Sequence, residues 1–337
     1  MRQGLGRVPV DRVAPGASLS QVDASDLLRG ALLQVSESDM IRGAVVSAPL
    51  SRGVVARYVA GEEVDDAVTV TGELRTTNRL ATIDYLGEDT VDRAQAEATR
   101  DTYVRLLDHL AAQDLARFGA AEVSVKLSAV GQALPRDGDA IALENARAIC
   151  EAADRVGTTV TLDMEDHTTT DRTLETLRAL RVDFPWVGAV LQSYLHRTEG
   201  DCRDLAHEGS RVRLCKGAYK EPESVAFQDG DDVDLSYVRC LKVLMGGDGY
   251  PMVASHDPRL VEIAQALANH HGRSPDSYEF QMLLGIRSAE QKRIADRGHQ
   301  MRVYVPFGED WYGYLVRRMA ERPANLQFFL RSLVGNG

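Results

Sequence analysis

Short apolar runs alternate with longer amphipathic stretches along most of this chain. The runs are rich in β-branched residues and have the length of about four to eight residues that is typical of strands. The stretches 139–156 and 170–180 carry apolar residues at three- and four-residue spacing, which predicts amphipathic helices. The pattern predicts eight strands, at residues 79–84, 122–127, 158–163, 187–192, 211–216, 250–255, 277–282 and 301–305.

Strands that alternate with helices indicate a parallel sheet. Eight such units favour closure into a barrel, and no Gly-x-Gly-x-x-Gly pattern of a dinucleotide-binding open sheet follows the first strand. We therefore predict an α/β fold of the (β/α)8, TIM-like class for residues 73–337. Residues 23–72 are predicted to form an N-terminal helical arm, and the polar residues 1–22 a disordered tail.

Composition narrows the class of protein. The 337 residues are 44% hydrophobic and carry a net charge of −11, which disfavours a nucleic-acid-binding protein because phosphate contact needs clustered basic residues. No apolar run reaches the about 18 residues of a membrane span, and the first twenty residues lack the apolar stretch of a secretory signal. The four cysteines form no Cys-x-x-Cys pair, so we expect buried thiols in a reducing cytoplasm.

Polar residues stand at the end of nearly every predicted strand. In a (β/α)8 barrel the active site lies at the carboxyl ends of the strands. One polar residue at a strand end is commonplace, but seven that converge on one rim predict a site. They are Lys126, Asp163, Gln192, Lys216, His256, Gln281 and Tyr304.

The densest of these segments is 211–219. Gly217 allows the backbone to approach a ligand closely, and Arg213 and Lys216 supply positive charge. Strict alternation places these two side chains on opposite faces, so they converge only if the strand ends before Lys216. The alternative is a salt-bridged strand end.

The last predicted helix, 310–321, carries a polar face. Tyr314, Arg317, Arg318 and Glu321 lie at helical spacing on this face. Two arginines beside a tyrosine suit bidentate binding of a carboxylate. A solvated polar face is the alternative.

Two other kinds of chemistry fit parts of the pattern. Lys216 could form a Schiff base in a barrel lyase or aldolase, with Arg213 beside it. Asp163 and Glu165 share a strand face and could bind a metal with His196 and His256, as in a metal-dependent hydrolase. Neither a His-x-His nor a His-Glu-x-x-His pattern supports the metal, so we predict none.

Motifs across roughly residues 75–330 match one known family in order. Arg-x-x-Lys-Gly-Ala-Tyr and Tyr-Leu-Val-Arg-Arg-x-x-Glu are together quite specific. The sequence resembles bacterial proline dehydrogenases, both the monofunctional enzymes and the matching domain of bifunctional proline-utilisation proteins. The matching stretches are 85–88, 125–128, 162–165, 191–194, 213–219, 254–257, 278–281 and 314–321.

The resemblance implies a distorted barrel with its last helix over the mouth and a non-covalently bound FAD. It implies oxidation of L-proline to 1-pyrroline-5-carboxylate, with electrons passed to a membrane quinone by a cytoplasmic enzyme in peripheral contact with the inner face of the membrane. It also allows for a 1-pyrroline-5-carboxylate dehydrogenase as partner. Hydroxyproline is the alternative substrate, but Tyr304 in the ring pocket would crowd a 4-hydroxyl group.

The resemblance also assigns roles to residues. Asp163 and Arg213 would be catalytic, with Arg213 near flavin N5, and Glu88 would pair with Arg317 as a gate. The family usually has threonine where Ser255 stands, and a hydroxyl group is retained. The substrate would contact Lys126, Tyr219, Tyr304, Tyr314, Arg317 and Arg318. FAD would contact Met164, Gln192, Arg213, Lys216, Gly217, Ala218, Ser255 and His256.

Overall fold

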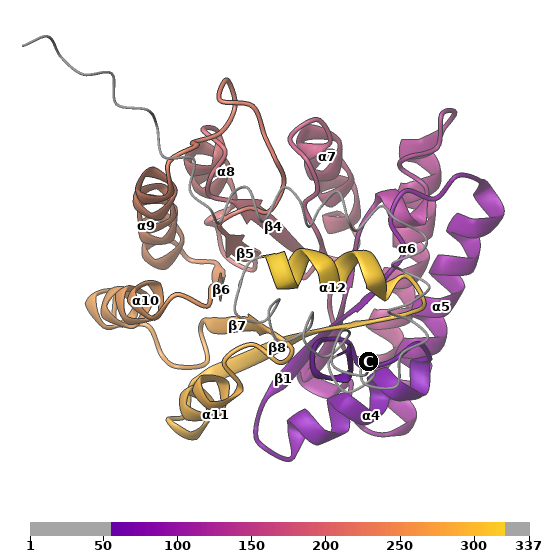
Figure 1. Cartoon of the computed structure of the whole chain (residues 1–337), viewed down its shortest axis with the longest axis horizontal. Coiled ribbons are helices and arrows are strands. Elements are labelled where there is room, and N and C mark those ends of the chain that lie inside the picture. Colours follow the sequence, from indigo (N-terminus) through magenta and orange to yellow (C-terminus); the bar gives the residue numbers. More distant parts are fainter. Residues whose placement is uncertain (1–54, 321–337) are drawn as a thin grey trace, which may run out of the picture.

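The computed structural model describes residues 55–320, in which eight parallel strands form a closed barrel (Figure 1). The first and last strands close it, with Leu80 paired with Arg302 and Tyr85 with Phe307. The predicted barrel is confirmed, with strand bounds that differ by a few residues from those predicted. The strands are β1 (Leu80–Tyr85), β2 (Ala121–Val125), β3 (Val160–Leu162), β4 (Gly188–Gln192), β5 (Arg211–Cys215), β6 (Tyr250–Ala254), β7 (Glu279–Leu283) and β8 (Gln300–Phe307).

One α-helix follows each of the first seven strands in the described range. Local sequence sets several of their ends. The Asp92 side chain accepts a hydrogen bond from the Gln95 backbone and begins one helix, whereas Gly157, in a left-handed conformation, ends the next. The helices are α5 (Arg93–Ala112), α6 (Gly138–Val156), α7 (Thr170–Arg181), α8 (Thr198–Leu205), α9 (Gly230–Gly246), α10 (Pro258–His270) and α11 (Ser288–Asp296).

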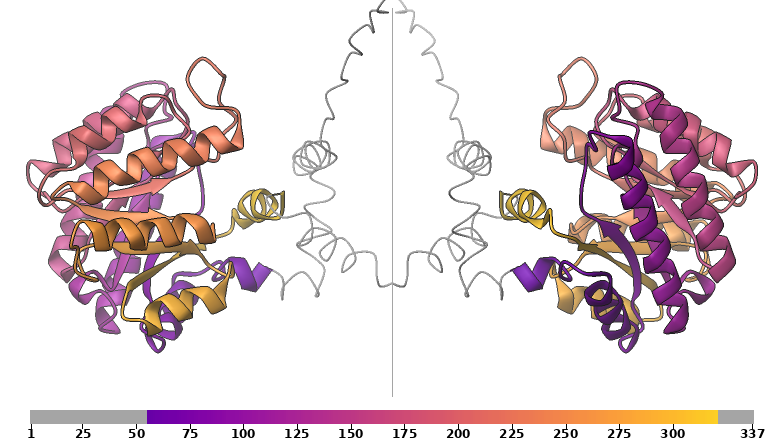
Figure 2. Two further views of the ribbon diagram at one scale, coloured as in Figure 1. Left: turned by 90° about the vertical axis from the view of Figure 1, so that its left-hand side faces the viewer. Right: turned by 90° about the vertical axis from the view of Figure 1, so that its right-hand side faces the viewer.

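Two further helices complete the architecture. The helix α4 (Val64–Arg75) contacts β1, β8 and α5, and so takes the place in the ring between α11 and α5 (Figure 1). The helix α12 (Trp311–Ala320), which follows β8, lies across the end of the barrel instead of joining the ring (Figures 1 and 2). The prediction that the last helix covers the mouth is confirmed.

The proposed N-terminal segments lie largely outside the described residues. This holds for the tail, 1–22, and for residues 23–54 of the arm. The division between arm and barrel at residue 72 stays a prediction, although α4 continues across that position. No helix in the described range is both long and apolar enough to cross a membrane.

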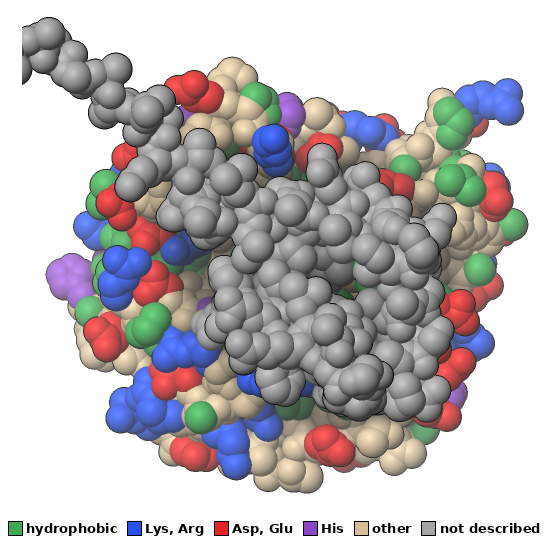
Figure 3. Space-filling model, viewed as in Figure 1, with side chains coloured by type: hydrophobic (Ala, Val, Ile, Leu, Met, Phe, Trp, Pro, Cys, Tyr) green, Lys and Arg blue, Asp and Glu red, His purple; other side chains and the backbone are tan. Residues whose placement is uncertain are grey.

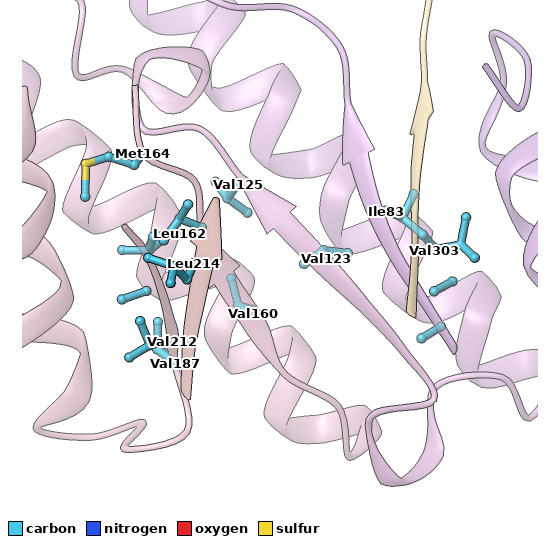
Figure 4. Close-up of a cluster of buried hydrophobic side chains, with 14 of the residues drawn as sticks. Ile83, Val123, Val125, Val160, Leu162, Met164, Val187, Val212, Leu214 and Val303 are labelled. Atoms are coloured by element: carbon cyan, nitrogen blue, oxygen red, sulfur yellow. The ribbon is translucent and has the colours of Figure 1, made fainter. Parts of the chain in front are cut away.

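The two faces of the barrel sheet differ in chemistry. Apolar residues such as Ile83, Val123 and Leu214 face outward and form one hydrophobic cluster with the surrounding helices (Figure 4). Alternate positions face the barrel axis, where (β/α)8 barrels commonly hold branched apolar side chains. Here that interior contains charged residues, including Glu122 and Arg213, which are almost completely buried. On the outer surface seen from the mouth, acidic and basic side chains are intermixed around the rim (Figure 3).

Candidate active site

A buried ion pair joins the carboxyl end of β3 to the middle of β5. The Arg213 guanidinium donates through Nη1 to Asp163 Oδ1 at 2.7 Å and to Ser124 Oγ at 2.9 Å. The Ser124 hydroxyl in turn donates to the same Asp163 oxygen at 2.7 Å. Buried charges are tolerated when they are paired and hydrogen-bonded, and this arrangement fixes the orientation of both side chains.

Tyr304 of β8 holds the second oxygen of the same carboxylate. Its hydroxyl donates to Asp163 Oδ2 at 2.8 Å, and the Arg213 guanidinium carbon lies 5.5 Å from the centre of its ring. Burial and the nearby Asp163 and Asp84 raise the pKa of the Tyr304 phenol well above its ordinary value. Tyr304 therefore remains a hydrogen-bond donor, and its ring is fixed against the arginine.

A second ion pair lies beside this group. Lys126 Nζ is 2.6 Å from Asp84 Oδ2 and 3.8 Å from Glu88 Oε1. Burial opposes the charge of Lys126, but Asp84, Asp163 and Glu88 outweigh it and raise the pKa of the ammonium group. Burial raises the pKa of Asp84 to about 6, against the opposing effect of Lys126. A fixed positive charge therefore stands at the ends of β1 and β2.

The raised pKa of Asp84 predicts a pH effect on stability. Since the folded value of about 6 lies above the ordinary value, the folded protein keeps a proton that the unfolded chain has lost between about pH 4 and 6. Asp84 therefore makes the free energy of unfolding fall as pH rises through this window. We expect the difference in that free energy between wild type and Asp84→Asn to fall over the same window, as measured by urea denaturation at several pH values. A difference that rises or stays constant would contradict this assignment.

A second group of buried charged residues lies deeper in the barrel and contacts Arg213. Glu122, which is fully buried, lies 2.6 Å from Arg211 Nη2, 3.7 Å from Arg213 and 3.8 Å from Arg302. Burial opposes ionisation of Glu122, but the three arginines outweigh it and lower the pKa of the carboxyl group. Arg302 also pairs with Glu279 at 2.8 Å. Arg213 is thus held between Asp163 on one side and Glu122 on the other.

Lys216 belongs to a separate group. The strand β5 ends at Cys215, which is the condition under which Lys216 could have turned toward Arg213. The Lys216 ammonium instead pairs with Asp234 of α9 and lies 3.7 Å from Asp257. The Asp257 backbone donates to Ser255 Oγ at 3.1 Å, so Lys216 and Ser255 share one neighbourhood at the ends of β5 and β6. Lys216 is a salt-bridged residue between carboxylates. It lacks the apolar floor that a Schiff-base lysine needs, so the lyase alternative is not supported.

Other predicted cofactor contacts surround the mouth. Gln192 donates to the Glu165 carbonyl oxygen at 2.6 Å, and His256 Nε2 accepts from the Leu283 backbone at 3.0 Å. Met164 lies at the edge of the hydrophobic cluster (Figure 4). Gly217 has a φ of 116°, and a Cβ there would meet the Tyr194 ring at 2.4 Å, so only glycine fits this position.

The remaining predicted residues are more dispersed. Ala218 and Tyr219 lie at the surface, whereas Tyr314 is buried in a cluster with Trp311 and Leu315. Arg317 and Arg318 lie on α12, but their side chains, like Glu321, fall outside what the structure describes. Gln281 reaches Glu279 inside the barrel and not the rim.

The proposed metal ligands take other roles. Asp163 pairs with Arg213, and Glu165 accepts from the backbone and hydroxyl of Ser128 at 3.1 and 2.5 Å. Among the residues described, no three His, Cys, Asp or Glu side chains gather as a metal site would require.

Several buried polar atoms near the site have no hydrogen-bond partner within residues 55–320. They include Arg213 Nε, Arg211 Nη1 and Ser193 Oγ. An unpaired buried polar group costs about 1–3 kcal/mol, and a bound molecule with acceptor atoms would remove that cost. Arg213 Nε is therefore an unsatisfied donor in the barrel interior.

A closed barrel with buried, oriented charges at the carboxyl ends of its strands defines a (β/α)8-barrel enzyme. Residues 67–331 match the family model described as proline dehydrogenase. The chain therefore belongs to the proline dehydrogenase family, and it is an oxidoreductase of that class.

Individual relatives agree. A proline dehydrogenase of Deinococcus radiodurans is 39% identical over 280 residues, covering 82% of this chain and 89% of the relative. Proline dehydrogenase 1 of Bacillus subtilis is 37% identical, covering 82% and 90%. The solved structure of proline utilization A from Bdellovibrio bacteriovorus superposes with a TM-score of 0.75 at 25% identity, covering 90% of this chain and 37% of that chain.

Proposed function

We propose that this enzyme uses FAD to oxidise L-proline to 1-pyrroline-5-carboxylate and passes the electrons to a membrane quinone. The observation that carries the proposal is the buried Arg213, which Asp163 and Glu122 hold in place and whose Nε has no described partner. Family membership supports the substrate. When bound, FAD supplies the two-electron acceptor that amino-acid side chains lack.

The chain's own residues would supply positioning and electrostatics. The proposed cofactor contacts are Met164, Gln192, Lys216, Gly217, Ala218, Ser255 and His256. Arg213 provides a fixed positive charge in a buried environment, where preorganised charge stabilises negative charge that develops during oxidation. Asp163 keeps the guanidinium in place and is the proposed orienting residue.

Substrate binding would use the side of the mouth that lies across from the proposed cofactor contacts. Lys126 is charged and held at the strand ends, where it suits a carboxylate. Arg317 and Arg318 of α12 are the other proposed carboxylate ligands, since that helix crosses the mouth (Figure 2). Glu88 lies beside Lys126 and is proposed to close the site with Arg317.

Tyr219, Tyr304 and Tyr314 would line the ring pocket. The Tyr304 hydroxyl is bonded to Asp163, so this ring is not free to move aside for a 4-hydroxyl group. That constraint supports proline over hydroxyproline as substrate. We also propose cytoplasmic location with peripheral contact at the inner face of the membrane, and a 1-pyrroline-5-carboxylate dehydrogenase as a partner.

A spectrum of the purified protein tests the central claim. We expect the visible absorbance of an oxidised flavin, and we expect L-proline to bleach it under anaerobic conditions because the substrate supplies two electrons. D-proline and 4-hydroxyproline serve as comparison compounds and should bleach it more slowly. A colourless protein that cannot be reconstituted with FAD would refute the proposal.

A further inference from the structure

A cavity of about 460 Å³ lies at the end of the barrel opposite the mouth. It forms where the amino ends of β1 and β8 meet the last turn of α4 and the loop that follows α11. We call it the basal cavity. Its polar lining residues are Thr71, Arg75, Asn78, Arg79, His299 and Gln300.

The basal cavity is positively charged, although the chain as a whole is acidic. No aspartate or glutamate is present among its lining residues. Arg79 is partly buried and donates to Thr77 Oγ1 and Gln291 Oε1, both at 2.9 Å, and it forms no ion pair with a described carboxylate. Burial, with Arg297 and Arg293, lowers the pKa of His299, which favours the neutral imidazole. The local excess of positive charge therefore comes from Arg75 and Arg79.

The helix dipole of α4 explains why Arg75 is present but not why Arg79 is. Carboxyl ends of helices attract cations, and Arg75 stands in the last turn of α4. Arg79 is different, because its described partners are a neutral hydroxyl and a neutral amide. These groups satisfy two N–H donors of the guanidinium but leave its charge uncompensated.

We propose that the basal cavity binds a small organic anion through a phosphate or carboxylate group, with Arg79 as the principal anchor and Arg75 and His299 beside it. A guanidinium donates two parallel hydrogen bonds to either group. The volume far exceeds the roughly 30 Å³ share of one water molecule, so the ligand can carry an organic body. Apolar surface for that body comes from Leu80, Leu115, Ala120 and Ala295.

Calorimetric titration of the purified full chain, without proline, tests this site. The probes are inorganic phosphate, glycerol 3-phosphate and succinate. We expect saturable binding of at least one organic probe, and a loss of about tenfold or more in affinity, or about 1.4 kcal/mol, in Arg79→Gln. Arg75→Gln, at an exposed position, should weaken binding too, and it provides a second variant if Arg79→Gln folds poorly. The matched control is Arg136→Gln, which removes the same charge from an exposed loop and should bind as wild type.

The probes distinguish the two chemistries. Binding of glycerol 3-phosphate alone supports a phosphate ligand, and binding of succinate alone supports a carboxylate ligand. The proposal is overturned if neither organic probe binds more tightly than about 10 mM. It is also overturned if both cavity variants bind as wild type, or if Arg136→Gln weakens binding equally. Because the measurement involves no turnover, it stands apart from the test with proline.

Discussion

Replacing Glu122 by alanine is expected to destabilise the fold by about 3–5 kcal/mol, which is the usual effect of breaking a buried ion pair from one side. Glu122 is fully buried and lies within 4 Å of Arg211, Arg213 and Arg302. Its removal leaves three guanidinium groups crowded in the barrel interior with less opposing charge. Urea denaturation measures the change in the free energy of unfolding.

An exposed carboxylate provides the control for Glu122. Glu144 pairs with Arg93 at 3.2 Å, but its side chain is 66% exposed, so Glu144→Ala should change stability by only about 0–1 kcal/mol. Glu122→Gln should destabilise less than Glu122→Ala because the amide keeps a hydrogen-bond acceptor. If Glu122→Ala and Glu144→Ala were equally stable, the interior network would not hold the barrel together.

Replacing Arg213 by lysine is expected to slow reduction of the proposed FAD cofactor by proline about 100- to 1,000-fold, which is the typical effect of removing one preorganised electrostatic group. A lysine retains charge but has a single nitrogen, whereas Arg213 reaches Ser124 and Asp163 through Nη1 and Thr82 and Glu122 through Nη2. Anaerobic stopped-flow absorbance measures the rate, and circular dichroism checks that the variant folds.

Asp163 should act through Arg213, so their effects should not add. Asp163→Asn is expected to slow reduction, and the double variant should be little worse than Arg213→Lys alone, because one residue positions the other. Arg136→Lys, at an exposed position, should leave the rate unchanged. Normal reduction by Arg213→Lys would remove this guanidinium from the chemistry.

Hydrophobic patterning predicted the strands well because β2, β5 and β8 alternate between apolar and polar positions, while β4 and β6 are short apolar runs. The same alternation also predicts the buried polar network in the barrel interior, which the residues at the strand ends alone do not predict. Glu122, Ser124 and Lys126 are separated by Val123 and Val125, which already places the three polar residues on one face. Since outward apolar residues must meet the helices, the polar set could have been assigned to the barrel axis.

Other features of the site depend on distant parts of the chain. Asp84 meets Lys126 across 42 residues, and only the register of β1 against β2 brings them together. The Lys216 side chain points toward Asp234 of α9. No local sequence pattern predicts where α9 places that carboxylate. The position of α4 in the ring was likewise hidden, because an amphipathic helix shows that it packs but not where.

The closure of the ring by α4 and the pairing of β1 with β8 has a consequence for folding of the newly made chain. Arg302 bonds to the carbonyl oxygen of Ala81 across 221 residues, and α4 packs against the same last strand. During synthesis, one edge of β1 therefore remains unpaired until β8 has left the ribosome. Pairing between such remote segments is slow, and uncovered strand edges promote aggregation. The closed ring can therefore form only after nearly all of the described barrel has been synthesised.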